Sequence, residues 1–297
     1  MTAIAFSVFA CKKKGCTDIT ASNYSQEAEK DDGSCDLTNS GPKLIVKVRF
    51  DDTQARLDNF GNPVGVGTGN SAQSPVFHGM GLHYIELAQS PYTQLGDGEV
   101  IYQGEETTVG GDKAVVFEKV KISGNNETIM EIPLKNVNAD SFKWLRTSLN
   151  YQNYDIDYTA NGVDYTGRLA SFVGFNTYIT NYTINTQIKT INANKLQGYW
   201  AIETLGYVTE GQAPQTTVPN PLSATSPIPA GSCVVTGEFS TPFVISGNET
   251  EDITLVLSFS TNKSFEWHDD NMDGKYDPLD GDYVVDMGSR GLELIIE

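Results

Sequence analysis

Leu44-Ile-Val-Lys-Val-Arg-Phe50 is the stretch that decides the fold of this 297-residue chain. Its apolar residues recur at every second position, with β-branched or charged residues between them. A β-strand points successive side chains to opposite faces, so this period of two predicts a strand with one face buried in a core.

Similar short runs recur along the rest of the chain, and clusters of Gly, Asn and Asp separate them. No long stretch has an uninterrupted helical period. These features predict an all-β fold, an antiparallel β-sandwich, with a length that fits one large sandwich or two fused ones. The runs are Val100–Tyr102, Ala114–Phe117, Trp144–Leu149, Leu169–Phe175, Tyr178–Ile184, Tyr199–Ile202, Cys233–Phe239, Ile253–Phe259 and Leu292–Ile296.

The main body is expected to span residues 43–297. Residues 210–230 contain five prolines, and proline cannot donate a hydrogen bond to a central sheet. This segment reads either as a linker between two domains or as a long crossover pinned to one sandwich. We favour the crossover, because the sequence after it is short for a separate sandwich.

An Asp-rich segment near the C-terminus, residues 269–280, has the spacing of a calcium-binding loop. Calcium takes six to eight oxygen ligands, and Gly274 permits the sharp turn that a short loop needs. The expected ligands are the side chains of Asp269, Asn271, Asp273, Asp277 and Asp280, together with the carbonyl of Lys275.

The flanks of this segment read as strands, and its twelfth position is Asp instead of the usual Glu. In both respects it resembles the Asp-rich calcium loops of extracellular modules, including dockerins. Eight acidic residues and one lysine lie between Glu266 and Asp286. A structural calcium ion that fastens the last hairpin is therefore expected. The alternative is a solvated acidic turn that binds nothing.

The N-terminus begins with an apolar run that ends in a small residue followed by Cys11. Residues 1–10 look like the remnant of a bacterial lipoprotein signal peptide, which predicts lipidation at Cys11. The run is short for a complete signal peptide and lacks its basic region. The alternative is an ordinary N-terminal strand with a buried cysteine.

Residues 15–18 (GCTD), 21–24 (ASNY) and 31–35 (DDGSC) resemble a short module that is common in exported proteins of Bacteroidetes. The resemblance implies an exported protein and a Cys16–Cys35 disulfide, which an oxidising compartment permits. It covers about 21 residues, so residues 11–42 are expected to form a tether. Three lysines follow Cys11 where surface-exported lipoproteins tend to carry acidic residues, which leaves the face of the outer membrane open.

The formal net charge of −18 argues against nucleic-acid binding, which requires basic surface to neutralise phosphate. The sequence has no apolar run of about 18 residues or more, so only the N-terminal lipid is expected to hold the protein at a membrane. Cys233 lies in an apolar, strand-like run, and we expect it to be a buried thiol without a chemical role.

Two histidines and a methionine lie close together in residues 77–86: His78, Met80 and His83. Imidazole and thioether ligands suit copper, so these residues are a candidate second metal site. On a regular strand, however, His78 and Met80 share one face and His83 takes the other. The alternative is a strand bent at its glycines, with histidines in ordinary hydrogen bonds.

Residues 151–165 are rich in tyrosine, amides and acids, and Tyr151, Tyr154, Tyr158 and Tyr165 form a candidate ligand-binding face. Flat rings stack on sugar faces, and polar groups fix sugar hydroxyls. Tyrosine also packs well on half-buried sheets, so a purely structural role is the alternative.

No catalytic motif such as Gly-x-Ser-x-Gly occurs in the sequence, and no carboxylate pair stands out among so many acids. The leading hypothesis is therefore a lipid-anchored binding or accessory protein of the cell envelope, with a structural calcium site. Its partner would be an outer-membrane protein complex or an extracellular glycan. The alternatives are a polysaccharide hydrolase and a metal-carrier lipoprotein.

Overall fold

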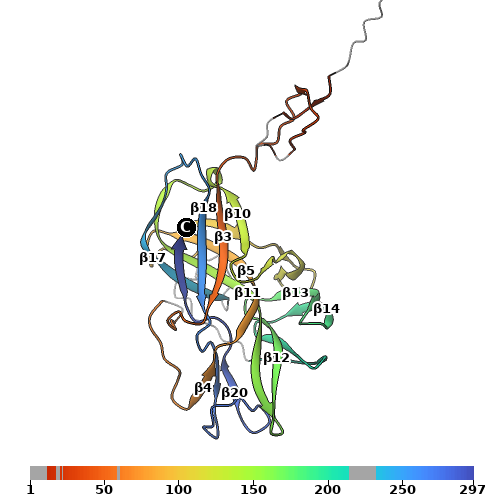
Figure 1. Ribbon diagram of the computed structural model, residues 1–297, viewed down its shortest axis with the longest axis vertical. Coiled ribbons are helices and arrows are strands. Elements are labelled where there is room, and N and C mark those ends of the chain that lie inside the picture. The colour runs from red at the N-terminus through yellow and green to blue at the C-terminus, as the bar shows by residue number, and fades with distance from the viewer. Residues whose placement is uncertain (1–11, 18–20, 22, 59–60, 214–231) are drawn as a thin grey trace, which may run out of the picture.

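The computed structural model describes residues 12–17, 21, 23–58, 61–213 and 232–297 (Figure 1). In this part of the chain nearly every element is a β-strand. The only helices there are two single turns, η1 (Phe117–Lys119) and η2 (Leu134–Asn136). None of the described helices is long and apolar enough to span a membrane. The expected signal remnant, Cys11 and most of the proline-rich segment lie outside the described residues.

The first layer of the body, here called the front sheet, has the strand order β10-β3-β18-β21. The pattern that predicts the first strand is confirmed, because Leu44, Val46 and Val48 are fully buried while the residues between them are only partly so. Burying each such side chain contributes about 1.5–3 kcal/mol. The strands are β10 (Thr128–Pro133), β3 (Lys43–Asp51), β18 (Ile253–Ser260) and β21 (Leu292–Ile296).

The second layer, here called the central sheet, is built on β11 (Asp140–Ala160). One edge of β11 pairs first with β17 and then with β12, and its other edge pairs with β5. The remaining members are β6 and β9 beside β5, and β15 and β16 beyond β12. Their bounds are β5 (Val76–Ala88), β6 (Glu99–Gln103), β9 (Ile122–Ser123), β12 (Val163–Phe172), β15 (Tyr199–Thr204), β16 (Tyr207–Gln212) and β17 (Cys233–Ile245).

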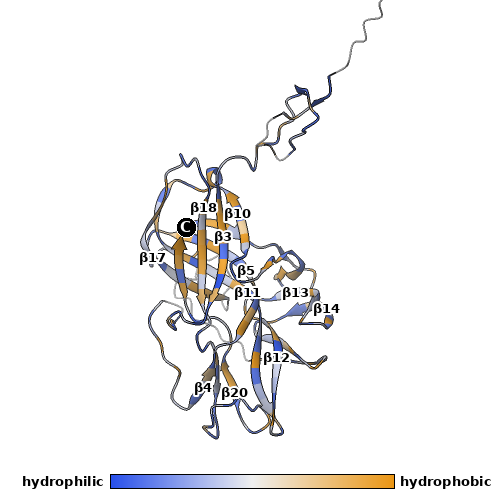
Figure 2. Ribbon diagram, in the orientation of Figure 1, coloured by the Kyte–Doolittle hydropathy of each residue, from blue (hydrophilic) through white to orange (hydrophobic). Residues whose placement is uncertain are grey.

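The main hydrophobic core lies between the front and central sheets, which gives the sandwich-like arrangement that the sequence predicts. Front-sheet residues such as Leu257 and Phe259 pack in one cluster with central-sheet residues such as Ile85, Leu145 and Phe239. Figure 2 shows apolar residues concentrated along these strands, in contrast to the polar N-terminal segment.

Most strand pairs of the body are antiparallel, but β3 with β18, β17 with β21 and β8 with β13 pair in parallel. A second cluster covers the opposite face of the central sheet, where Phe172 and Tyr199 pack against Phe117 and Tyr182. Over this face lies a four-stranded sheet of order β14-β13-β8-β7. Its strands are β7 (Glu106–Thr107), β8 (Ala114–Val116), β13 (Thr177–Thr183) and β14 (Ile188–Lys195).

A small three-stranded sheet of order β20-β19-β4 lies at the end of the body opposite the N-terminal segment (Figure 1). Its strands are β4 (Asn70–Gln73), β19 (Phe265–His268) and β20 (Tyr283–Asp286). The Asp-rich segment connects β19 to β20, as the strand-like flanks predict. We call this sheet, together with residues 269–282, the distal lobe.

The N-terminal segment extends away from the body (Figure 1). It contains the parallel pair β1 (Lys14–Gly15) and β2 (Lys30–Asp31). The Cys16–Cys35 disulfide implied by the resemblance is present. Asn23 braces the loop, since it donates to the carbonyl of Ser34 and accepts from the backbone N–H of Asp36.

Candidate functional site: a groove beside the distal lobe

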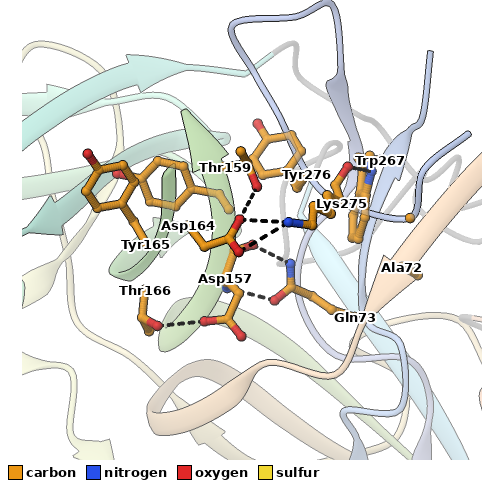
Figure 3. Close-up of a pocket in the computed structure, with 12 residues that line it drawn as sticks. Ala72, Gln73, Asp157, Thr159, Asp164, Tyr165, Thr166, Trp267, Lys275 and Tyr276 are labelled. Atoms are coloured by element: carbon orange, nitrogen blue, oxygen red, sulfur yellow. Dashed lines mark hydrogen bonds and ion pairs between the residues drawn. The ribbon is translucent and has the colours of Figure 1, made fainter. Parts of the chain in front are cut away.

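A groove with a cavity volume of about 500 Å³ lies where the end of the β11–β12 hairpin meets the distal lobe. Residues 157–159 and 164–166 line one side, and Gly274, Lys275 and Tyr276 line the other (Figure 3). Two segments that are separate in the sequence analysis, the tyrosine-rich run and the Asp-rich loop, therefore form a single site.

Tyr158 and Tyr165 are direct cross-strand partners, and we call them the tyrosine pair. Their ring centroids lie 5.6 Å apart with an interplanar angle of 28°, so the rings are stacked. Both side chains are half-buried. The hydroxyl of Tyr158 hydrogen-bonds to Thr204 Oγ1 at 3.0 Å, which fixes one ring of the pair. Flat apolar surface thus reaches the groove on a rigid hairpin.

Tyr151 and Tyr154 do not belong to this groove. Tyr151 is 3% exposed in the second core cluster, and Tyr154 is fully buried in the main core. Both faces of the central sheet are covered, so a tyrosine in the middle of β11 is buried whichever way it points. Only where β11 extends beyond the covering layers do its tyrosines reach solvent.

Three contacts hold the hairpin against the distal lobe (Figure 3). The side-chain amide of Gln73 both donates to the carbonyl of Asp157 and accepts from its N–H, at 2.7 and 2.8 Å. The N–H of Thr159 donates to the carbonyl of Tyr276 at 2.7 Å. Lys275 Nζ lies 3.0 Å from Asp164 Oδ1. The groove walls are therefore fixed relative to each other.

Asp164 is the best-defined carboxylate of the groove. It accepts hydrogen bonds from the hydroxyl of Thr159 and from Lys275, and these lower its pKa below the usual range for aspartate. Asp164 is therefore ionised at neutral pH and is unsuited to act as a general acid. Asp157 is exposed and accepts a hydrogen bond from Thr166 Oγ1 at 2.6 Å.

Asp269, the first residue of the Asp-rich loop, is only 1% exposed. Burial alone would raise its pKa, but hydrogen bonds from Ser71 and from the N–H groups of Gly274 and Asp273 outweigh burial and lower it. Gly274 has a φ of +78°, the left-handed conformation expected at the sharp turn. The loop is thus wound around an ionised, buried carboxylate.

The other expected calcium ligands make contacts of their own. Asp273 accepts from the amides of Lys275 and Asn271, and the Lys275 carbonyl accepts from the indole N–H of Trp267 at 3.1 Å. Asp277 is 7% exposed, whereas Asp280 is exposed.

Asp282, two residues beyond the expected loop, bonds to the N–H groups of Asp270 and Asp277. Across the described ranges, no group of three or more His, Cys, Asp or Glu side chains is placed to hold a metal ion.

The residues of the candidate copper site have different neighbours. His78 Nε2 lies 2.8 Å from Asp155 Oδ2, and His83 Nε2 lies 3.1 Å from Glu106 Oε1. Met80 is fully buried in the main core. The structure therefore does not bring the three side chains to one point. A bulge in β5 between Phe77 and Gly79 breaks the strand alternation on which the grouping depends.

Cys233 is a free cysteine that is partly buried against the main core, less than the sequence predicts, and burial raises its pKa to about 12. This agrees with a thiol that takes no part in chemistry at neutral pH.

Sequence reasoning missed Gln73 and Trp267 as groove residues. Gln73 lies in the unremarkable segment Asn70–Gln73, and Trp267 precedes the Asp-rich loop. The sequence offers a hint only for Trp267, because an aromatic residue next to a binding loop often lines the binding site. Nothing local could have placed Gln73 beside Asp157, which is 84 residues away.

No protein-family model, curated protein or solved structure matches this chain. The functional argument therefore depends on the groove itself.

Proposed function

We propose that this chain is a lipid-anchored binding protein of the cell envelope and that its groove holds a carbohydrate. The tyrosine pair carries the proposal, because it presents stacked, half-buried rings beside fixed polar groups. Sugar rings stack on such aromatic faces, and carboxylate, amide and hydroxyl groups pair with sugar hydroxyls. Asp157 and Thr166 pair on the other face of the hairpin from the tyrosine pair, so the polar groups available to a sugar on the rings are those of the facing wall, such as Gln73 and Lys275.

Charge favours a neutral sugar over an acidic one. Among the residues that the structure describes, Lys275 is the only cation that lines the groove, and Asp164 already neutralises it. Asp157 adds a further negative charge, and the whole chain has a net charge of −18. A uronic acid or a sulfated sugar would meet like charge there, with no free cation to offset it.

The test is a titration of the purified protein with neutral and uronic-acid oligosaccharides. We expect saturable binding of at least one neutral oligosaccharide. Tyr165→Ala should weaken that binding about tenfold, since it removes one stacking ring. Tyr207→Ala is the matched control, because Tyr207 is 83% exposed on β16 and does not line the groove. Equal affinities for both variants would place the ligand elsewhere.

A hydrolase acting in this groove is the alternative from another class. It would need one carboxyl group that is protonated near neutral pH, and the lowered pKa of Asp164 argues against that residue. A reducing-sugar assay on each bound oligosaccharide separates the two functions. Release of new reducing ends by the wild type, and not by Asp157→Asn, would replace binding with hydrolysis.

The anchor is the second part of the proposal. The lipobox-like Cys11 and the GCTD-type module support an exported lipoprotein of Bacteroidetes type. The expected result is a diacylated N-terminal cysteine in mass spectra of protein from a native membrane. Cys11→Ser should release the protein into the soluble fraction. An unmodified Cys11 in membrane-bound protein would contradict the anchor.

An outer-membrane protein complex is a second candidate partner, favoured by apolar surface on the distal lobe. Met272, Leu279, Tyr283 and Val285 are 71%, 62%, 59% and 43% exposed. Exposed apolar side chains gathered on one lobe are typical of protein-binding surfaces. Cross-linking from a photoreactive residue at position 279 should capture one outer-membrane protein. Capture that is equally efficient from position 244, on β17, would argue against a specific surface.

The Asp-rich loop supports a structural calcium ion as the third part. Its spacing, the left-handed Gly274 and the ionised Asp269 all suit the ion. Calcium at a hundred times its dissociation constant should stabilise the fold by about 2.7 kcal/mol, because it binds only the folded state. Melting with calcium and with a chelator measures this effect. Asp273→Ala should abolish it, and an unchanged wild-type melt would contradict the site.

A further inference from the structure

A second cavity, of about 270 Å³, lies on the face of the central sheet that the second core cluster covers. It shares no lining residue with the groove. Phe117 from η1, Tyr151 from β11 and Tyr182 from β13 form aromatic walls. These rings are fixed, because Phe117 packs edge-on against both tyrosines. We call this cavity the aromatic pocket.

The local sequence of β5 builds one side of the aromatic pocket. Phe77 pairs with Tyr154 and Gly79 pairs with Asn153, so His78 is the extra residue of a β-bulge. A bulge re-aims the side chain that it carries. A Cβ added at Gly79 would lie only 2.7 Å from the side chain of Ile122. Glycine therefore lets Ile122 pack directly on the strand and form the pocket rim.

His78 is held in one orientation at this pocket. Its Nε2 bonds to Asp155 Oδ2, and Arg168 pairs with both oxygens of the same carboxylate. Burial would raise the pKa of Asp155, but the bonds from Arg168 and His78 outweigh burial and lower it. Because Asp155 is ionised, it can only accept a hydrogen bond, so Nε2 of His78 carries the hydrogen. In the neutral imidazole, Nδ1 is then an acceptor.

Asn153 supplies a second acceptor at the aromatic pocket. Its amide nitrogen donates to the Tyr151 hydroxyl at 3.2 Å and to the Ile184 carbonyl at 3.0 Å. The carbonyl of Ile184 can only accept, so the amide cannot be flipped, and both of its hydrogens are used. The Asn153 side-chain oxygen remains able to accept a hydrogen bond from a ligand.

We propose that the aromatic pocket binds a planar aromatic ring that carries an N–H or O–H donor, of the size of an indole or a phenol. The volume suits one such ring, and the walls of Phe117, Tyr151 and Tyr182 match its apolar faces. His78 in its neutral form and Asn153 each offer an acceptor, which favours a ligand that donates a hydrogen bond. This site is independent of the carbohydrate groove.

The test uses indole as the probe, titrated into the full chain and followed by calorimetry. We expect saturable binding at one site. Ile122→Trp should weaken binding by at least about tenfold, since Ile122 is 39% exposed at the rim and the larger ring would fill the mouth. His78→Phe keeps a ring but removes the acceptor, and should weaken binding about three- to tenfold. Val244→Trp, at a 58% exposed position of β17, is the matched control and should bind as the wild type does.

A measurement on the wild type guards against a variant that does not fold. Nuclear Overhauser contacts between bound indole and the Ile122 methyl groups should appear in NMR spectra. Absence of saturable binding, an unchanged affinity in folded Ile122→Trp, or bound indole without contacts to Ile122 would each overturn the proposal. Binding of benzene as tight as that of indole would overturn the role given to His78 and Asn153.

Discussion

The sandwich core and the distal lobe are held together by different forces. In the core, Leu257 and Phe259 of β18 are fully buried among other apolar side chains. The distal lobe also contains an aromatic cluster of Phe265, Trp267 and Tyr276, but it adds a buried carboxylate, that of Glu266, which is 3% exposed. Glu266 bonds to Arg56, to Arg290 at 3.2 Å and to the amide of Asn70 at 2.6 Å.

This difference has a consequence for the groove. Apolar packing is non-directional and depends little on pH, whereas a buried ion pair is costly unless every partner is in place. The groove lies on the lobe that contains this buried ion cluster. Its geometry should therefore respond to single polar substitutions around Glu266, while the apolar core between the two sheets should respond to lost burial.

The largest effect should come from removing one buried group in each region. Phe259→Ala should lower the free energy of unfolding by about 3–5 kcal/mol, from lost burial and the cavity left behind. Glu266→Gln should cost about as much, because the guanidinium of Arg56, at 7% side-chain exposure, keeps its charge but loses its counter-charge. Urea unfolding of both variants measures these losses.

Hydrogen exchange sharpens the comparison between the two variants. Glu266→Gln should speed exchange first in β4 and β19, while Phe259→Ala should affect β3 and β18. The double variant Arg56→Met/Glu266→Gln should recover part of the loss, since no unpaired charge then remains. A double variant less stable than Glu266→Gln alone would show that Arg56 contributes mainly by packing.

A smaller effect is expected on the pH dependence of stability, where the two regions should lose stability at different pH values. His83, in β5 of the central sheet, has a pKa lowered by burial, which Glu106 only partly offsets. Its unfolded form binds protons first, so the stability that it confers is complete above pH 6.5 and is lost as pH falls below that value.

Glu266 and Asp269 also have lowered pKa values, although burial alone would raise both. Their contribution is present above their unfolded values of 4.5 and 3.8, and it is lost only as pH falls through the lower folded values. Stability measured against pH should therefore fall in two stages. His83→Gln should remove the first stage alone; a first stage that survives in this variant would mean that another group causes it.

The sequence predicts some parts of the structure better than others. The alternation in Lys43–Asp51 predicts both a strand and its buried face, because one face of β3 meets the core and the other does not. The alternation fails for Tyr151 and Tyr154, because both faces of the central sheet are covered. The period of two cannot tell which layer covers a residue.

The candidate site was only half predictable. The tyrosine-rich run and the Asp-rich loop are each visible as a composition, but about a hundred residues separate them along the chain. Their meeting depends on the Gln73–Asp157 and Thr159–Tyr276 contacts, which join distant segments through backbone groups and one glutamine amide. None of these groups marks its partner in the local sequence. The parallel pairing of β3 with β18 is equally invisible to local patterns.

The smallest effect should come from the ion pair between Lys275 and Asp164, although it closes the groove. Its side chains are 55% and 71% exposed, so solvent screens the attraction, and such pairs contribute about 0–1 kcal/mol. Lys275→Ala should therefore hardly shift the melting temperature. Gln73→Ala should shift it more, because it leaves the backbone N–H and carbonyl of Asp157 without their partner. If Lys275→Ala proved the more damaging of the two, charge would hold the hairpin to the distal lobe. The preference for a neutral sugar, which assumes that Asp164 neutralises Lys275, would then need revision.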